Sequence, residues 1–281
     1  MDGARAMQYA REIVAFGPRW DGSKALDQVR TYIKGKLKGD QVEEDAFVAE
    51  TSAGKMPMRN IIARYPGSKD CMIVVGSHYE TNYWLRNTRF VGANDGAATS
   101  GLLLAIADQL RGKRLEGCGV WLVFFDGEES FTKQWNDNDA LWGSRRLAAK
   151  WKEDGTSKKV KAFLLADMIG DADLDIQRDT NSTPWLEDVV LQAATRLGYQ
   201  SHFFAETTTI AGDDHIPFAG AGIPVADIID INYGYNGSLH HSPEDTLDKI
   251  SSKSLDVSGN VILETIRLLN GMSDSPPPSS R

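Results

Sequence analysis

Three short apolar runs in this sequence each lead into a histidine or a carboxylate, the side chains that bind metal ions and move protons. In open α/β sheets, ligands bind beyond the carboxyl ends of the strands. If the three runs are strands of one sheet, these side chains meet at one edge and form a candidate site. The side chains are His78, Glu128, Glu129 and Asp167, with Glu80 two positions after the histidine.

Two polar loops add further metal-binding side chains. The segment FVGANDG places Asp95 among glycines, and the segment SLHHSPEDT contains His240 and His241. Carboxylate oxygen and imidazole nitrogen are common zinc ligands, and a catalytic zinc site keeps one position open. We therefore predict that Asp95, Glu129 and His241 bind zinc.

Glu128 is the carboxylate next to a predicted ligand, Glu129. Adjacent residues of an extended segment point to opposite sides. One of the pair can therefore bind metal while the other faces the substrate. We predict that Glu128 is a general base.

Each motif also has a purely structural interpretation. A Glu-Glu pair is usually solvated, residues 94–96 (Asn-Asp-Gly) form a common turn, Asp213 and Asp214 could cap a helix, and the two adjacent histidines could be exposed. His78 could be a core histidine. The site is favoured because several such groups occur together at predicted strand ends.

The elements that must position these residues alternate between strands and helices, which predicts an α/β three-layer sandwich with helices on both faces. Fully apolar runs predict a mixed, mostly parallel central sheet. Residues 1–272 are predicted to form a single catalytic domain, and residues 273–281 a disordered tail. The predicted helices are 4–16, 23–38, 98–111, 139–151, 184–197 and 252–271, and the predicted strands are 41–50, 60–67, 71–77, 119–125 and 162–166.

Composition excludes several classes of partner. The chain has 281 residues, a formal net charge of -8 and only two cysteines, Cys71 and Cys118. An acidic protein is a poor ligand for nucleic acid or an anionic membrane, and no apolar run reaches the roughly 20 residues that span a bilayer. The two cysteines could form a disulfide if their strands are neighbours; two free buried thiols are the preferred interpretation. We expect a monomer.

The order of these residues resembles the zinc aminopeptidase fold family, and the resemblance extends over about residues 5–270. In that family five such side chains bind two metal ions, and the glutamate before the metal-binding glutamate is the base. The matching segments are GSHYE, GANDG, FFDGEE, LLADMIG and HHSPEDTL.

Longer segments resemble the glutaminyl-peptide cyclotransferases, specifically bacterial proteins similar to the animal enzymes. These segments include FVGANDGAATSGLLL, VWLVFFDGEESF, ALWGSRRLAAK, DDHIPF and AGIPVADIID. The resemblance implies one zinc ion on the three predicted ligands, Glu128 as base, supporting catalytic roles for Asp167 and Asp213, and Trp135 as the pocket tryptophan.

The chain departs from that family pattern at four places. The family's His-x-Asp is here a histidine followed by Glu80, so His78 and Glu80 are expected to support the metal ligands from behind. Trp135 comes one residue later than in the family. His240 replaces a tryptophan, and Asp227 replaces the histidine of the animal enzymes. Trp135, His240 and Asp227 are expected to contact substrate.

The resemblance implies that the protein cyclises N-terminal glutaminyl residues of peptides and proteins to pyroglutamate, with release of ammonia. The alternative is a two-zinc aminopeptidase in which His78 and Asp167 are additional ligands. A binding protein without activity is a third reading, disfavoured because the predicted base and ligands are all present. The chain contains no signal peptide, but the resemblance suggests a periplasmic or secreted protein.

Overall fold

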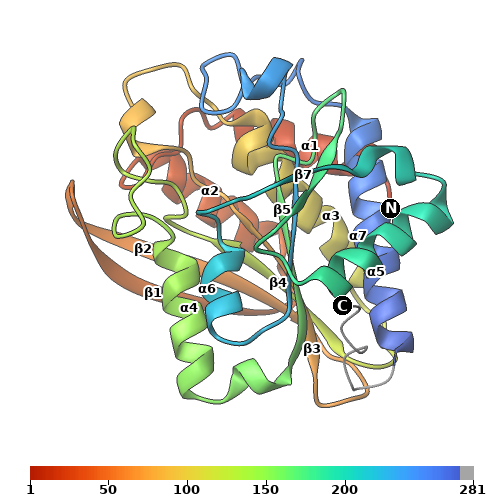
Figure 1. Ribbon diagram of the computed structural model, residues 1–281. Coiled ribbons are helices and arrows are strands. Elements are labelled where there is room, and N and C mark those ends of the chain that lie inside the picture. The colour runs from red at the N-terminus through yellow and green to blue at the C-terminus, as the bar shows by residue number, and fades with distance from the viewer. Residues whose placement is uncertain (273–281) are drawn as a thin grey trace.

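The structure is a computed structural model that describes residues 1–272 (Figure 1). A six-stranded sheet with the strand order β1-β2-β4-β3-β5-β8 forms its centre. The pairs β3–β4, β3–β5 and β5–β8 are parallel, whereas β1–β2 and β2–β4 are antiparallel. A separate two-stranded sheet pairs β6 with β7. The strands are β1 (Gln41–Thr51), β2 (Gly54–Tyr65), β3 (Met72–His78), β4 (Gly119–Phe125), β5 (Val160–Asp167), β6 (Ile176–Asp179), β7 (Phe203–Thr208) and β8 (Val225–Ile229).

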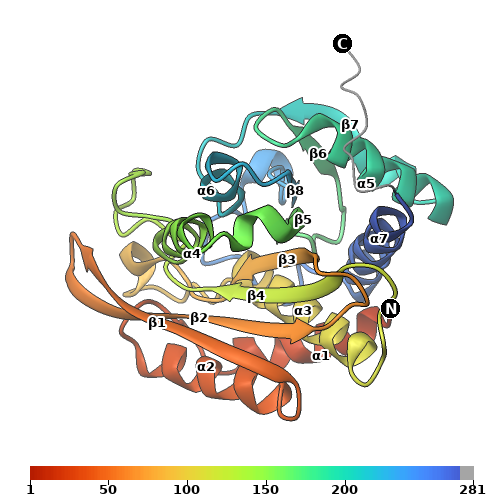
Figure 2. The ribbon, with the colours of Figure 1, turned by 90° about the horizontal axis from the view of Figure 1, so that it is seen from below.

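Helices cover both faces of the large sheet, as the view along its edge shows (Figure 2). Helices α4 and α6 lie on one face, and α1, α2, α3, α5 and α7 belong to the hydrophobic core on the other. The helices are α1 (Gly3–Val14), α2 (Lys24–Lys36), α3 (Thr99–Leu110), α4 (Trp142–Glu153), α5 (Pro184–Leu197), α6 (His215–Gly220) and α7 (Ser252–Gly271).

The period-two alternation of the strands divides their side chains between the two core layers. In β3, Ile73 and Val75 pack with the larger helix layer, and Met72 and Val74 pack with α4 and α6. This arrangement confirms the predicted three-layer α/β sandwich with a mixed, mostly parallel sheet. The predicted single domain over residues 1–272 stays a prediction, and the tail 273–281 lies outside the described residues.

Cys71 and Cys118 form a disulfide, so the preferred interpretation of two free thiols is wrong. The reason is the register of the neighbouring parallel strands β3 and β4, in which Met72 pairs with Gly119. The cysteines directly precede these partners, and their Cα atoms are 4.7 Å apart. That separation is within the range that a disulfide requires.

Short or polar elements were not predicted. Strands β6, β7 and β8 and helix α6 contain only four to six residues each. Asp227 interrupts the apolar run of β8, which hides the strand from a search for apolar segments. Within residues 1–272, no helix combines the length and hydropathy that crossing a membrane requires.

Candidate metal and catalytic centre

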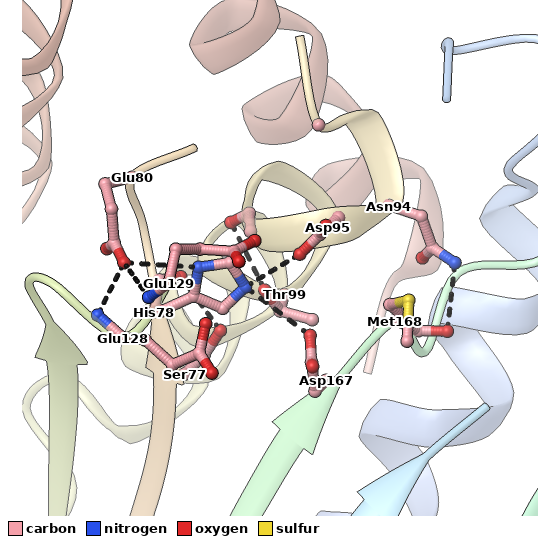
Figure 3. A network of polar contacts seen from close by, with 12 residues as sticks. Ser77, His78, Glu80, Asn94, Asp95, Thr99, Glu128, Glu129, Asp167 and Met168 are labelled. Atoms are coloured by element: carbon pink, nitrogen blue, oxygen red, sulfur yellow. Dashed lines mark hydrogen bonds and ion pairs between the residues drawn. The ribbon is translucent and has the colours of Figure 1, made fainter. Parts of the chain in front are cut away.

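The carboxyl ends of the parallel strands bring the predicted residues together (Figure 3). β3 ends at His78, which pairs in register with Phe125 at the end of β4, and β5 ends at Asp167. Glu128 and Glu129 follow β4 on an irregular segment. All four of these polar residues are less than one-tenth exposed. The prediction that they share one edge of the sheet is confirmed.

Asp95 lies on a helical turn, Ala93–Ala98, whose backbone is irregular at its centre. Asp95 has φ -83° and ψ 87°, and the following Gly96 has φ 93°. A β-carbon on Gly96 would lie 2.9 Å from the Glu80 carbonyl oxygen and 3.0 Å from Cε1 of His78. Glycine therefore allows the turn to approach His78, and Asp95 Oδ1 lies 3.1 Å from His78 Nε2.

Two oppositely charged side chains hold this turn from either side. Arg19 has no exposed surface and donates to the carbonyls of residues 79, 91, 92 and 95. Asp245 accepts from the backbone N–H groups of Asn94 (2.9 Å) and Asp95 (3.1 Å). Sequence reasoning missed both residues. Asp245 lies in the segment HHSPEDTL, four residues after His241, whereas no sequence pattern around Arg19 indicates its role.

The three predicted zinc ligands converge. His241 Nε2 lies 3.2 Å from Glu129 Oε2 and 3.6 Å from Asp95 Oδ2. Zinc binds such atoms tetrahedrally at about 2.0–2.2 Å, which places neighbouring ligand atoms about 3.3–3.6 Å apart. Asp95 Oδ2 and Glu129 Oε1 are buried and have no hydrogen-bond partner among the described residues. The donor set and its spacing therefore fit one zinc ion.

A second group of atoms lies beside this set. His78 Nε2 is 3.5 Å from Asp167 Oδ1 as well as 3.1 Å from Asp95. His78, Asp95 and Glu129 also offer ligand atoms within 4.8 Å of one another. The types and positions of these side chains are therefore compatible with the aminopeptidase alternative, in which His78 and Asp167 bind a second ion.

Glu80 supports the site in a way the sequence did not indicate. Its Oε1 accepts from the backbone N–H groups of Glu128 (2.7 Å) and Glu129 (3.2 Å). The distance from Glu80 Oε1 to His78 Nδ1 is 3.8 Å, too long for a hydrogen bond. The longer glutamate therefore holds the backbone of the two site glutamates, and it does not orient His78 directly.

A pocket of about 80 Å³ opens beside the predicted ligands. This is smaller than the roughly 300–1,000 Å³ of sites for drug-sized ligands, so it suits one side chain of a substrate. The polar lining residues are Asp95, Glu128, Glu129, Asp167, Asp213, His240 and His241, and the others are Trp135, Met168, Ile210, Gly212, Ile229 and Ile231.

The predicted substrate contacts are only partly placed at this pocket. Trp135 and His240 line it, and Trp135 packs against Gly212. Asp227 is not among the residues that line it, and its side chain has no exposed surface. The structure does not place Asp227 at the pocket, and its predicted contact with substrate stays a prediction.

An aromatic ring that sequence reasoning missed stands beside the metal histidine. Trp84 lies edge-on to His241, with ring centroids 6.2 Å apart. The ring of His240 is tilted against that of His241 at 3.8 Å. Trp84 comes from the segment after β3, so an aromatic neighbour is present although His240 replaces the family tryptophan.

Burial and crowding alter the protonation of the site. Burial raises the pKa of Glu128 well above its usual value, and the charge of Glu129 raises it further. Burial also raises the pKa of Glu129, to about 7, although His241 opposes the shift. For His78, burial lowers the pKa, but the nearby carboxylates of Asp167 and Asp95 raise it well above its usual value. A bound metal cation would offset this concentration of negative charge.

Comparison with known proteins agrees with this geometry. The glutaminyl cyclase of an Acidobacteriales bacterium is 50% identical, with 96% of this chain and 95% of that chain covered and a TM-score of 0.93. The Porphyromonas gingivalis glutaminyl cyclase is 28% identical, with coverage of 95% and 98% and a TM-score of 0.84. The glutaminyl-peptide cyclotransferase of Drosophila melanogaster is 28% identical over 265 residues, 85% of this chain and 73% of its own length. The model described as "Peptidase family M28" matches residues 60–266. The match covers well over half of the 281 residues, and this chain belongs to peptidase family M28.

Proposed function

We propose that this protein is a zinc-dependent glutaminyl-peptide cyclotransferase that converts N-terminal glutaminyl residues of peptides and proteins to pyroglutamate. The observation that carries the proposal is the small pocket in which Glu128 lies beside the convergent ligands Asp95, Glu129 and His241. The similarity to glutaminyl cyclases, up to 50% identity over nearly the whole chain, supports it.

Asp95, Glu129 and His241 would hold one zinc ion, which as a Lewis acid polarises a carbonyl oxygen and stabilises developing negative charge. Glu128 accepts a proton from the substrate's α-amine as the amine nitrogen attacks the side-chain amide carbon. The bond between that carbon and the amide nitrogen then breaks. Glu128 returns the proton to the departing nitrogen, which leaves as ammonia.

The pocket contributes mainly by orientation. The attack is intramolecular, so a flexible side chain must be held in one folded conformation. Trp135 and the apolar wall formed by Met168 and Ile210 confine that side chain. The carboxyl groups of Asp167 and Asp213 line the same pocket and can hold the leaving nitrogen or Glu128 by hydrogen bonds.

The proposal is tested with purified zinc-loaded protein and a Gln-initiated peptide followed by mass spectrometry. We expect loss of one ammonia from an otherwise intact peptide. Glu128→Gln should reduce kcat by roughly 10²- to 10⁴-fold, the usual contribution of a general base, and should retain zinc. Glu153→Gln, at the exposed end of α4, is the matched control and should behave as wild type. Near-normal turnover by the Glu128 variant would refute the assignment.

A two-zinc aminopeptidase is the second candidate, favoured by the positions of His78 and Asp167 beside Asp95. In that reaction the same peptide would lose its N-terminal residue. Zinc content distinguishes the two: we expect one ion per chain for the cyclase, and two would favour the peptidase.

We further propose that the protein works in an oxidising compartment, the periplasm or the exterior of the cell. The disulfide between Cys71 and Cys118 supports this, because disulfides are rare in reducing compartments. Thiol labelling of protein taken from fractionated cells tests the proposal. Labelling of both cysteines in a cytosolic fraction would contradict it.

A further inference from the structure

Behind the pocket lies a buried group of ionisable residues that the proposed reaction does not use. His215 begins α6, Asp179 ends β6, and Asp227 lies in β8, elements that pack together (Figure 2). None of the three side chains has any exposed surface. Burying charged groups destabilises a fold unless the charges are paired, so we expect a role that explains why these three residues lie together.

The two carboxylates face different nitrogens of the imidazole ring. His215 Nε2 lies 3.1 Å from Asp179 Oδ2, and His215 Nδ1 lies 3.4 Å from Asp227 Oδ2. A neutral imidazole has a hydrogen on only one nitrogen, whereas a protonated ring can donate from both. One ligand atom from each of the three residues lies within 4.8 Å of the others, but the two carboxylates face different ring nitrogens, and only one ring nitrogen can bind a single ion. The arrangement therefore suits an imidazolium held between two carboxylates.

Asp179 is the carboxylate that the surrounding residues hold in place by hydrogen bonds. Asp179 accepts from the backbone N–H of Ile210 (2.8 Å) and from the hydroxyl of Ser182 (3.2 Å). The Ser182 hydroxyl also accepts from the backbone N–H of Asp227 at 2.9 Å. Asp179 is thus a well-satisfied anion that fixes His215, the pocket residue Ile210 and the strand of Asp227 relative to one another.

The inner end of the group reaches the active site. Asp213, two residues before His215, lines the pocket with Glu128, and the charge of the buried Asp227 acts on it. Burial and the charge of Asp227 raise the pKa of Asp213 well above its usual value. Burial also raises the pKa of Asp227, to about 7, and the adjacent imidazolium opposes that shift.

We propose that His215 is a positioning residue of the active site: as a buried imidazolium it pairs with Asp179 and Asp227, and so fixes the segment that carries Asp213 into the pocket. The role in turnover rests on the proposed cyclase function. The groups that face His215 are Asp179 from β6, Asp227 from β8 and Asp214 from the segment before α6. Burial lowers the pKa of His215, but these negative charges raise it more.

The protonation of His215 is tested on the full zinc-loaded chain with ¹⁵N-labelled histidine. Long-range ¹H–¹⁵N spectra are recorded above pH 7, where a free imidazole with a pKa of about 6.5 is mostly neutral. The signal is assigned by its loss in His215→Asn. We expect hydrogens on both ring nitrogens. One bare ring nitrogen would overturn the proposal, whether or not the protein cyclises glutaminyl peptides.

The positioning role is tested by kinetics. His215→Asn should lower kcat by roughly 10- to 100-fold, as loss of orienting groups does, and shift the pH profile, while KM and zinc content stay near wild type. Asp179→Asn should give a smaller loss in the same direction, and it serves if the histidine variant fails to fold. His202→Asn is the control, because His202 lies outside the site, with its Nδ1 3.0 Å from the carbonyl oxygen of Leu174. Unchanged kcat and pH profile in both His215→Asn and Asp179→Asn would overturn the role.

A double mutant separates charge from shape. In His215→Asn, Asp227 becomes an uncompensated buried anion, whereas His215→Asn with Asp227→Asn removes both charges. We expect the double mutant to recover part of the loss in denaturation midpoint, the coupling of a true charge pair. Strictly additive losses would overturn the pairing.

Discussion

Arg19 is fully buried and donates hydrogen bonds to four backbone carbonyls around the turn that carries Asp95. The bonds to Tyr79, Gly92 and Asp95 measure 2.7, 2.8 and 3.1 Å. We predict that Arg19→Met, which keeps the length of the side chain, destabilises the protein and weakens zinc binding.

The magnitude follows from the groups left behind. The carbonyl of Gly92 also accepts from Ala97, but those of Tyr79 and Val91 have no other donor among the described residues. Two buried carbonyls without a partner cost about 1–3 kcal/mol each, and Asp245 loses its neighbouring cation. We expect the free energy of unfolding to fall by about 2–6 kcal/mol, the sum for the two carbonyls.

The effect on zinc follows from the position of Asp95. A turn released from Arg19 no longer fixes the Asp95 carboxylate, and such losses of support reduce metal affinity by roughly 10- to 100-fold. Urea denaturation of the zinc-free protein measures stability, and chelator competition measures affinity. Arg19→Lys should be intermediate, since its one ammonium group keeps the charge but cannot reach all four carbonyls.

Arg5→Met is the matched control for this experiment. Arg5 also contacts an acid, Asp108, at 3.1 Å, but its side chain is 41% exposed. Exposed ion pairs contribute about 0–1 kcal/mol. If Arg19→Met changed stability and zinc affinity as little as Arg5→Met, the argument for a clamped turn would be refuted.

Three further predictions concern other parts of the fold. Replacing Cys71 and Cys118 by alanine should lower the free energy of unfolding in urea by roughly 2–4 kcal/mol, because their bond closes a loop of sequence separation 47; an unchanged midpoint would contradict this. Gly212→Ala should displace Trp135 and raise KM about 3- to 10-fold with zinc content unchanged, since an aromatic contact is worth about 0.5–1.5 kcal/mol; unchanged KM would exclude Trp135 from the substrate pocket. Burial raises the pKa of Asp230 from 3.8 to about 7, so the folded state keeps a proton that the unfolded state releases and stability falls as pH rises between these values. Asp230→Asn should remove that part of the pH dependence of urea midpoints, and an unaltered slope would refute it.

The site residues at the ends of long apolar strands could be predicted, because a local run of apolar residues indicates a buried strand and the point at which it ends. Residues 119–125 are apolar throughout, so the polar residues that follow had to emerge at a strand end. The helix start at Ser23 was also predictable, and its side chain caps the N–H of Leu26. Local patterns therefore located the edge of the sheet and most of its ionisable residues.

The residues that hold the site in place could not be predicted in the same way. Arg19 and Asp245 act on the turn of Asp95 from 76 and 150 positions away along the chain. Asp227 is a charged residue within a buried strand, and the partner that compensates its charge, His215, lies on another element. Pairings of this kind depend on tertiary packing, which no local periodicity records.

The departure at Glu80 bears on the number of metal ions. A histidine that binds metal almost always donates its other ring N–H to a carboxylate, carbonyl or water, which fixes the ring. His78 Nδ1 is buried and has no hydrogen-bond partner among the described residues, because Glu80 binds the backbone of Glu128 and Glu129 instead. His241, by contrast, lies between two carboxylates and is partly open to solvent. His78 therefore lacks, among the described residues, the second hydrogen-bond partner that usually fixes a metal-binding histidine, and we expect zinc analysis of the purified protein to give one ion per chain rather than two.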